Sequence, residues 1–152
     1  MAMTTLWFED LRPGRMLTAG PYSVDHGEML AFAAKWDPLP IHVDPDAAAR
    51  TLHGGIIASG TYTIAVKQRL LTAVGFNDAI LGTMGHDAMR FPNPVRAGDR
   101  LTLTVECVFA RPSASRPTCG IVKYRVSLVN QSGAVVLDYL DTILIAKRPV
   151  PA

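Results

Sequence analysis

The feature that most constrains the fold is an uncharged apolar run in the first half of the chain. Residues Ile56 to Val66 carry no charged side chain on any face. A helix that is apolar all round is normally buried. We expect a helix over about Ile56–Val74, entered through Gly54-Gly55, with the charges at 67–69 marking its exit to solvent and Gly75 ending it. Other elements must therefore cover this helix.

The second half of the chain has the two-residue period of strands. Apolar and polar residues alternate from Leu101 to Phe109, from Val122 to Leu128 and from Val135 to Ile145. Such alternation predicts strands with one buried face. The segment Asn130–Gly133 predicts the turn between the last two strands. Two further strands are expected near Met16–Val24 and Gly82–Phe91.

The economical arrangement is an α+β fold in which an antiparallel sheet of about five strands wraps around one long central helix. Two shorter helices are expected before it. Residues Ser23–Trp36 have a capping pattern, Asp25 with Glu28, and Pro38 ends this helix. Asp44 can cap a second short helix that begins at Pro45. We expect one domain over residues 1–152.

Composition limits the classes of function. The 152 residues are 49% apolar and 18% charged, and the net charge is only +2, without a run of Lys and Arg. Nucleic-acid binding is thus not expected as the main role. Two cysteines without Cys-x-x-Cys spacing, and four histidines without ligand spacing, predict neither a disulfide framework nor a metal site. The N-terminus does not resemble a signal peptide and no apolar run could span a membrane, so we expect a cytoplasmic protein.

The stretch from Trp36 to Gly60 contains the candidate catalytic residues. Asp37 precedes His42 by five residues, and two prolines between them are expected to hold the loop extended. A carboxylate and an imidazole around one water can act as acid and base near neutral pH, because the ordinary pKa of histidine is ~6.5. An isolated Asp and His at this spacing more often belong to an ordinary polar loop, so the surrounding sequence must distinguish a catalytic pair from such a loop.

That context resembles a known family. The pattern Asp-x-x-Pro-x-His-x-Asp, from Asp37 to Asp44, resembles the hydratase signature of MaoC-like acyl dehydratases, which have the hot-dog fold. The segments His53–Gly60 and Arg90–Asp99 add to this resemblance, which covers roughly Leu6 to Lys147. It implies reversible hydration of a trans-2-enoyl thioester, usually of coenzyme A, to a (3R)-hydroxyacyl product, in a homodimer or larger assembly, with no cofactor besides the coenzyme A of the substrate.

The roles of individual residues follow from this chemistry. His42 is expected to take the proton of water, and Asp37 to orient that water and pass a proton to C2. Gly54 and Gly55 are expected at the N-terminus of the central helix, where free N–H groups could form an oxyanion hole. Ser59 could orient the site or serve only helix packing.

Two positions depart from the family pattern. Leu39 stands where the family has Asn or Gln, and Tyr62 stands where some relatives have a serine. We expect both to line the acyl site and set the acyl preference, with Leu39 drying the pocket and Tyr62 shortening the tunnel.

Other histidines favour structural roles. His53 is expected either to shape the glycine turn or to join the site. His86 and Asp87 are neighbours in a predicted strand and should point to opposite faces.

Two alternatives remain open at the level of sequence. A hot-dog thioesterase would direct water at the thioester carbonyl instead of C3, and a non-catalytic module would bind acyl thioesters without turnover.

Overall fold

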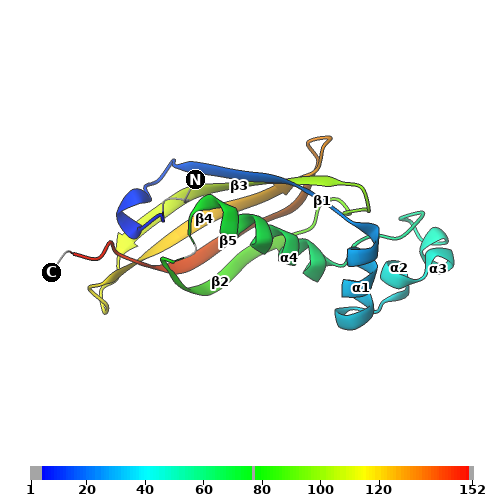
Figure 1. The fold of residues 1–152 in the computed structure, drawn as a ribbon, viewed down its shortest axis with the longest axis horizontal. Coiled ribbons are helices and arrows are strands. Elements are labelled where there is room, and N and C mark those ends of the chain that lie inside the picture. The colour runs from blue at the N-terminus through cyan, green and yellow to red at the C-terminus, as the bar shows by residue number, and fades with distance from the viewer. Residues whose placement is uncertain (1–4, 77, 151–152) are drawn as a thin grey trace.

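The computed structural model describes residues 5–76 and 78–150. Five strands form one antiparallel sheet in the order β1-β3-β4-β5-β2. Figure 1 shows the strands side by side, with the central helix lying across them. The sequence predicted all five, whose bounds are β1 (Met16–Ser23), β2 (Ile80–Arg90), β3 (Arg100–Pro112), β4 (Cys119–Val129) and β5 (Val135–Ala146).

The central helix α4 is shorter than the sequence predicted. It spans Gly60–Leu71 and continues as a short 3₁₀ helix, η2 (Thr72–Val74), to Gly75, whose φ of 100° ends it as expected. It does not begin at Ile56, because the Ser59 side chain accepts a hydrogen bond from the Tyr62 N–H and so caps the helix at residue 59. Residues 56–59 are therefore extended, and the predicted start was wrong.

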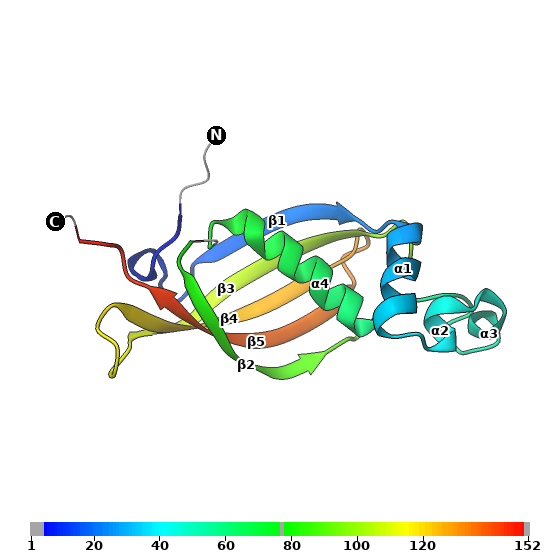
Figure 2. The same cartoon turned by 60° about the horizontal axis from the view of Figure 1, so that its bottom comes forward.

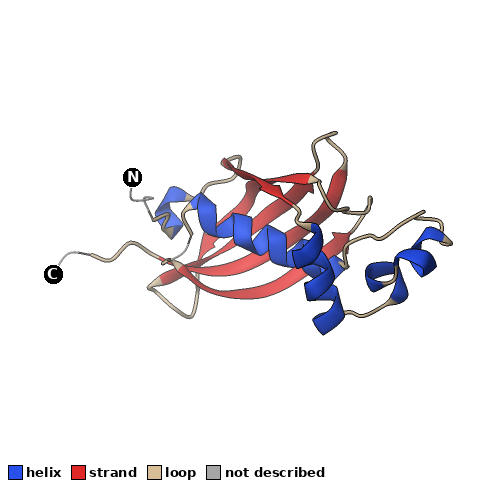
Figure 3. Cartoon of the chain, turned by 45° about the vertical axis from the view of Figure 1, so that its right-hand side comes forward, coloured by secondary structure: helices blue, strands red, loops and turns tan. Residues whose placement is uncertain are grey.

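The helix packs on one face of the sheet, as Figures 2 and 3 show. Alternate residues of the three central strands point toward it because successive side chains of a strand face opposite sides. One predicted feature of the helix was wrong: Lys67 does not mark an exit to solvent but is 2% exposed. The residues buried on the inner face of the sheet include Leu103, Val105, Cys107, Val122, Tyr124, Val126, Tyr139, Ile143 and Ile145.

Three helices lie beyond one end of the sheet, next to the start of α4 (Figure 2). They are α1 (His26–Trp36), α2 (Pro40–Val43) and α3 (Pro45–Ala49). The predicted caps are confirmed, since Asp25 accepts from the Glu28 N–H and Asp44 accepts from the first N–H groups of α3. The expected extended loop between Asp37 and His42 is wrong in part, because Pro40 begins the short helix α2 that carries His42.

Within residues 5–76 and 78–150, no helix is long and apolar enough to cross a membrane.

Candidate functional site

Asp37 and His42 are placed by the ends of two helices. Asp37 is the C-terminal cap of α1, where its N–H donates to the Ala33 carbonyl at 2.9 Å and Pro38 prevents another turn. His42 lies in α2, and its N–H donates to the Leu39 carbonyl at 2.8 Å. These turns bring the His42 Nε2 to 3.6 Å from the Asp37 Oδ2.

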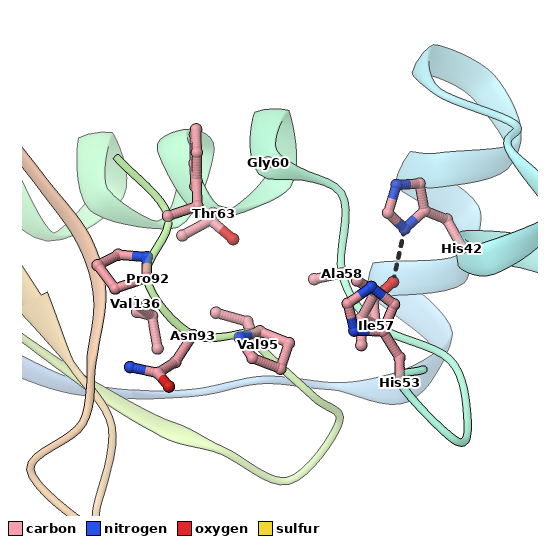
Figure 4. A pocket seen from close by; sticks show the side chains of 12 residues that line it. His42, His53, Ile57, Ala58, Gly60, Thr63, Pro92, Asn93, Val95 and Val136 are labelled. Atoms are coloured by element: carbon pink, nitrogen blue, oxygen red, sulfur yellow. Dashed lines mark hydrogen bonds between the residues drawn. The ribbon is translucent and has the colours of Figure 1, made fainter. Parts of the chain in front are cut away.

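The imidazole of His42 is held in one orientation. Its Nδ1 lies 2.8 Å from the Ile57 carbonyl oxygen, a contact drawn as a dashed line in Figure 4. A carbonyl can only accept, so Nδ1 carries the proton and the neutral ring has its lone pair on Nε2, toward Asp37. His42 is buried, whereas the Asp37 side chain is 30% exposed. The pair thus presents a base nitrogen and a carboxylate to a place that water can reach.

A cavity of about 280 Å³ adjoins His42. Figure 4 shows side chains from several elements around it, with Thr63 of α4 and Asn93 on the opposite side from the two histidines. Backbone bonds fix its wall, since the Ile57 N–H donates to the Ile41 carbonyl and the Ala58 N–H to the Val95 carbonyl. The lining residues are His42, His53, Ile57, Ala58, Gly60, Thr63, Phe91, Pro92, Asn93, Pro94, Val95 and Val136.

The structure changes the argument for Gly54 and Gly55. They form a turn before the extended segment 56–59, so they do not lie at the N-terminus of α4. The premise that their N–H groups are the free ends of a helix is wrong. The glycine at that terminus is Gly60, which lines the His42 cavity. Phe91 packs against it so closely that a Cβ on Gly60 would lie 3.2 Å from the ring.

The three expected substrate contacts lie elsewhere. The Leu39 side chain is 52% exposed, and only its carbonyl serves the site by accepting the His42 N–H. Ser59 is fully buried, and its hydroxyl caps α4 by accepting from the Tyr62 N–H. Tyr62 lines a different cavity, of about 210 Å³, between α1 and α4. The expectation that Tyr62 lies beside the catalytic pair is therefore not met in the His42 cavity.

Tyr62 belongs to a carboxylate-centred cluster. Its hydroxyl donates to the Glu28 Oε2 at 2.7 Å, and the Tyr22 hydroxyl donates to the same oxygen at 2.7 Å. The Phe32 ring meets the Tyr62 ring edge-on, with centroids 5.5 Å apart. Burial and the bond to Glu28 raise the pKa of the Tyr62 hydroxyl well above its ordinary value. Tyr62 thus ties α4 to α1.

Sequence reasoning missed Thr63 and Asn93 as cavity residues. Thr63 comes directly after Tyr62 in α4, and its side chain lines the His42 cavity. Asn93 donates from Nδ2 to the Val135 carbonyl at 2.9 Å, which leaves its amide oxygen for other partners. The loop from Phe91 to Val95 gave no helical or strand period that could have placed it over His42. His53, which had two possible roles, is a cavity residue.

A second group of charges lies further along α4, away from this cavity. Buried Asp141 of β5 accepts at 3.1 Å from the His86 Nδ1 of β2, and Lys67 faces them with its Nζ 5.4 Å from the Tyr139 ring centre. Desolvation raises the pKa of Asp141 and lowers the pKa of Lys67. His86 therefore pairs across strands, not with its neighbour Asp87. Among the described residues, no group of His, Cys, Asp or Glu is arranged to hold a metal ion.

Comparison with known proteins places these features in a family. The MaoC like domain model matches residues 10–130. The uncharacterized protein YdeM of Bacillus subtilis is 33% identical over 137 residues, covering 88% of this chain and 94% of that protein. An (R)-specific enoyl-CoA hydratase of Rhodospirillum rubrum is 26% identical over 155 residues, covering 93% of each chain.

Solved structures agree on the architecture. The MaoC-like dehydratase from Rhodospirillum rubrum superposes with a TM-score of 0.88 at 34% identity, covering 95% of this chain and 99% of that one. Rv0216 from Mycobacterium tuberculosis, described as a double hotdog fold, gives a TM-score of 0.78 at 19% identity over 97% of this chain and 47% of its own. The hot-dog fold expected from the sequence is confirmed. With its family model matched over most of its length, the chain belongs to the MaoC-like dehydratase domain family.

Proposed function

We propose that the protein adds water reversibly to trans-2-enoyl thioesters, giving (3R)-hydroxyacyl thioesters. The observation that carries this proposal is the fixed pairing of the His42 Nε2 with the Asp37 carboxylate at 3.6 Å, beside a cavity. The family includes hydratases of this type, such as the Rhodospirillum rubrum relative.

In this mechanism the His42 Nε2 takes a proton from a water that Asp37 orients. The water oxygen bonds to C3, the double bond moves toward the thioester carbonyl, and the Asp37–His42 pair returns one proton to C2. Positioned acid–base groups of this kind typically supply ~10²–10⁴ in rate. The bond from Nδ1 to the Ile57 carbonyl serves the step by keeping the lone pair of Nε2 directed at the water.

The thioester oxygen gains negative charge as C3 is attacked. We assign its stabilisation to the backbone N–H of Gly60, at the first turn of α4 and in the wall of the His42 cavity. The first N–H groups of a helix lack intrahelical acceptors and form the positive end of its dipole. Gly54 and Gly55 keep a proposed part as a side-chain-free surface along which the substrate can pass close to the backbone.

The test is an assay of hydration across enoyl-CoA chain lengths, followed by loss of the conjugated-thioester absorbance while thiol release is recorded in parallel. Loss of absorbance without thiol release, together with a (3R) product, supports the hydratase. Thiol release at the same rate as substrate loss would indicate the thioesterase, and tight binding without either change would indicate a non-catalytic acyl-thioester module.

A further inference from the structure

A separate cavity of about 320 Å³ lies on the other side of the glycine turn. It is an open depression bordered by α1, the start of α3, the turn and the loop before β3, and its lining residues are His26, Met29, Pro45, Gly55, Ile56, Arg96 and Ala97. This lining contains the cationic side chain of Arg96 and the imidazole of His26, and among the described lining residues there is no carboxylate. The remaining wall is apolar, so an anion in this cavity would meet the guanidinium with little competing charge.

Arg96 is held in place but retains free donors. Its Nη2 donates to the His53 carbonyl at 2.7 Å, which fixes the guanidinium against the glycine turn. Its Nη1 has no partner among the described residues and lies 3.7 Å from where a Cβ of Gly55 would stand. Among the described residues, the nearby Asp99 forms no ion pair with this guanidinium, and the two Asp99 oxygens accept from the Arg96 backbone N–H and from Gln131. A half-buried, fixed guanidinium with free N–H groups is suited to phosphate oxygens.

The glycine turn connects the two cavities. His53, Ile57 and Ala58 line the His42 cavity, whereas Gly55 and Ile56 line the Arg96 cavity. Between them, a Cβ built on Gly54 would meet nothing within 4 Å, and one on Gly55 would meet only the Arg96 guanidinium. A slender chain can therefore pass from one cavity to the other over bare backbone.

We propose that Arg96 binds the phosphate attached to the pantetheine arm of the substrate, with the arm crossing Gly54-Gly55 and the enoyl group at His42. This inference rests on the proposed function, because it takes an acyl thioester as the ligand. The same phosphate is present in coenzyme A and in the phosphopantetheine of a carrier protein. The cavity thus selects thioesters whose pantetheine bears a phosphate and disfavours simpler thioesters.

The experiment compares wild type with Arg96→Gln on four crotonyl thioesters: those of pantetheine, phosphopantetheine, coenzyme A and a phosphopantetheinylated carrier protein. We expect KM to rise about tenfold for the three that carry the phosphate, as for loss of a charge-assisted hydrogen bond, with kcat and the pantetheine kinetics unchanged. Arg100→Gln is the matched control, since it removes the same charge from an exposed arginine outside the cavity, and it should behave as wild type.

Two outcomes would overturn the proposal. One is an equal rise in KM for the pantetheine and phosphopantetheine thioesters. The other is a loss confined to the coenzyme A thioester, which would place a phosphate on the adenosine side at Arg96. Arg96→Lys keeps the positive charge, so it should lose less than Arg96→Gln. If Arg96→Lys and Arg96→Gln raised KM equally and both changed kcat on the pantetheine thioester, the effect would be assigned to the lost bond with His53. That result would contradict phosphate binding.

Calorimetric titration with free coenzyme A, free phosphopantetheine and free pantetheine separates this proposal from the hydratase assignment. A roughly tenfold weaker binding of both coenzyme A and free phosphopantetheine by Arg96→Gln, with pantetheine unaffected, supports the phosphate site even if no thioester is hydrated, whereas a loss confined to coenzyme A would overturn it. Unchanged coenzyme A affinity would reject the site even if hydration is found.

Discussion

At the scale of single residues, the Asp37–His42 pair carries the proposed chemistry. We predict that Asp37→Asn and His42→Ala each lower kcat by about 10²–10⁴, because each removes one of the two groups that handle the same proton. The double variant should lose little more than the worse single variant, since residues acting as a unit are not additive. Thermal unfolding should show that each variant is folded. Near-normal turnover in either folded single variant would contradict the assignment.

Tyr62 is predicted to act on stability. Tyr62→Phe removes the hydroxyl that joins α4 to Glu28 of α1, and we expect a loss of about 1 kcal/mol in the free energy of unfolding. Tyr22→Phe is the matched control, because Tyr22 donates to the same oxygen at the same distance from a more exposed position and should cost less. Denaturant unfolding of both variants measures the difference. A larger loss from Tyr22→Phe would show that burial does not set the value of this bond.

The sequence predicted that Asp37 and His42 lie close together but not the surroundings of Leu39 and Tyr62. The Asp37 position could be predicted because Pro38 ends α1 at the preceding residues. The side-chain directions could not, because they depend on where α4 begins. The predicted helix included residues 56–59, but the Ser59 cap places the start of α4 at Gly60, so these residues lie outside the helix.

At the scale of elements, Lys67 of α4 and Asp141 of β5 are buried near each other, and the carboxylate of Asp141 is paired with His86. Asp141→Leu leaves the buried Lys67 without its nearby carboxylate and should cost about 3–5 kcal/mol of stability, whereas Lys67→Met leaves Asp141 its pair with His86 and should cost less. The double variant should be near neutral or more stable than wild type, because desolvation of both charges is then avoided. Denaturant unfolding of the single and double variants tests this; an additive loss in the double variant would contradict it.

The dependence of stability on pH follows from the same pair. The pKa of Asp141 is raised in the folded state, so the folded protein holds this proton at pH values where the unfolded chain has released it. This group therefore lowers stability as pH rises above its ordinary value of 3.8. The lowered pKa of Lys67 acts in the opposite direction, lowering stability as pH falls below 10.5. The free energy of unfolding of the Lys67→Met/Asp141→Leu variant, measured from acid to alkaline pH, should therefore lack the pH dependence that Asp141 and Lys67 contribute in wild type.

The elements also show what pattern can and cannot predict. Three of the five strands were predicted because a two-residue period identifies a half-buried strand, and the two at the edges of the sheet were expected without so clear a period. The exposure of Lys67 was predicted wrongly because a charged residue after an apolar run was expected to face solvent. In the structure the Lys67 ammonium is buried near the Tyr139 ring and Asp141. A partner on a distant strand cannot be read from the spacing around Lys67.

At the scale of the whole molecule, β2 ends the sheet and leaves one edge unpaired in the single chain. It exposes Leu81 and Met84, and an open apolar edge favours pairing with another strand. We therefore propose a homodimer that joins two sheets edge to edge through β2, with both central helices on the same side. Light scattering at micromolar concentration should give the mass of a dimer.

A charge placed on this edge should separate the subunits. Met84→Glu is expected to give a monomer because it introduces a carboxylate into the proposed apolar contact. Leu52→Glu is the control, since Leu52 is 93% exposed and lies in the loop after α3. A wild-type monomer, or equal dissociation by both variants, would contradict a β2 interface.

The central claim is that water enters at C3 under the control of Asp37 and His42. The most direct test is mass spectrometry of the product formed from crotonyl-CoA in water enriched in oxygen-18. We predict a 3-hydroxybutyryl thioester that carries the label in its C3 hydroxyl, formed by wild type and not measurably by Asp37→Asn on the same time scale. Label found in a free carboxylate, with coenzyme A released and the double bond intact, would contradict the account.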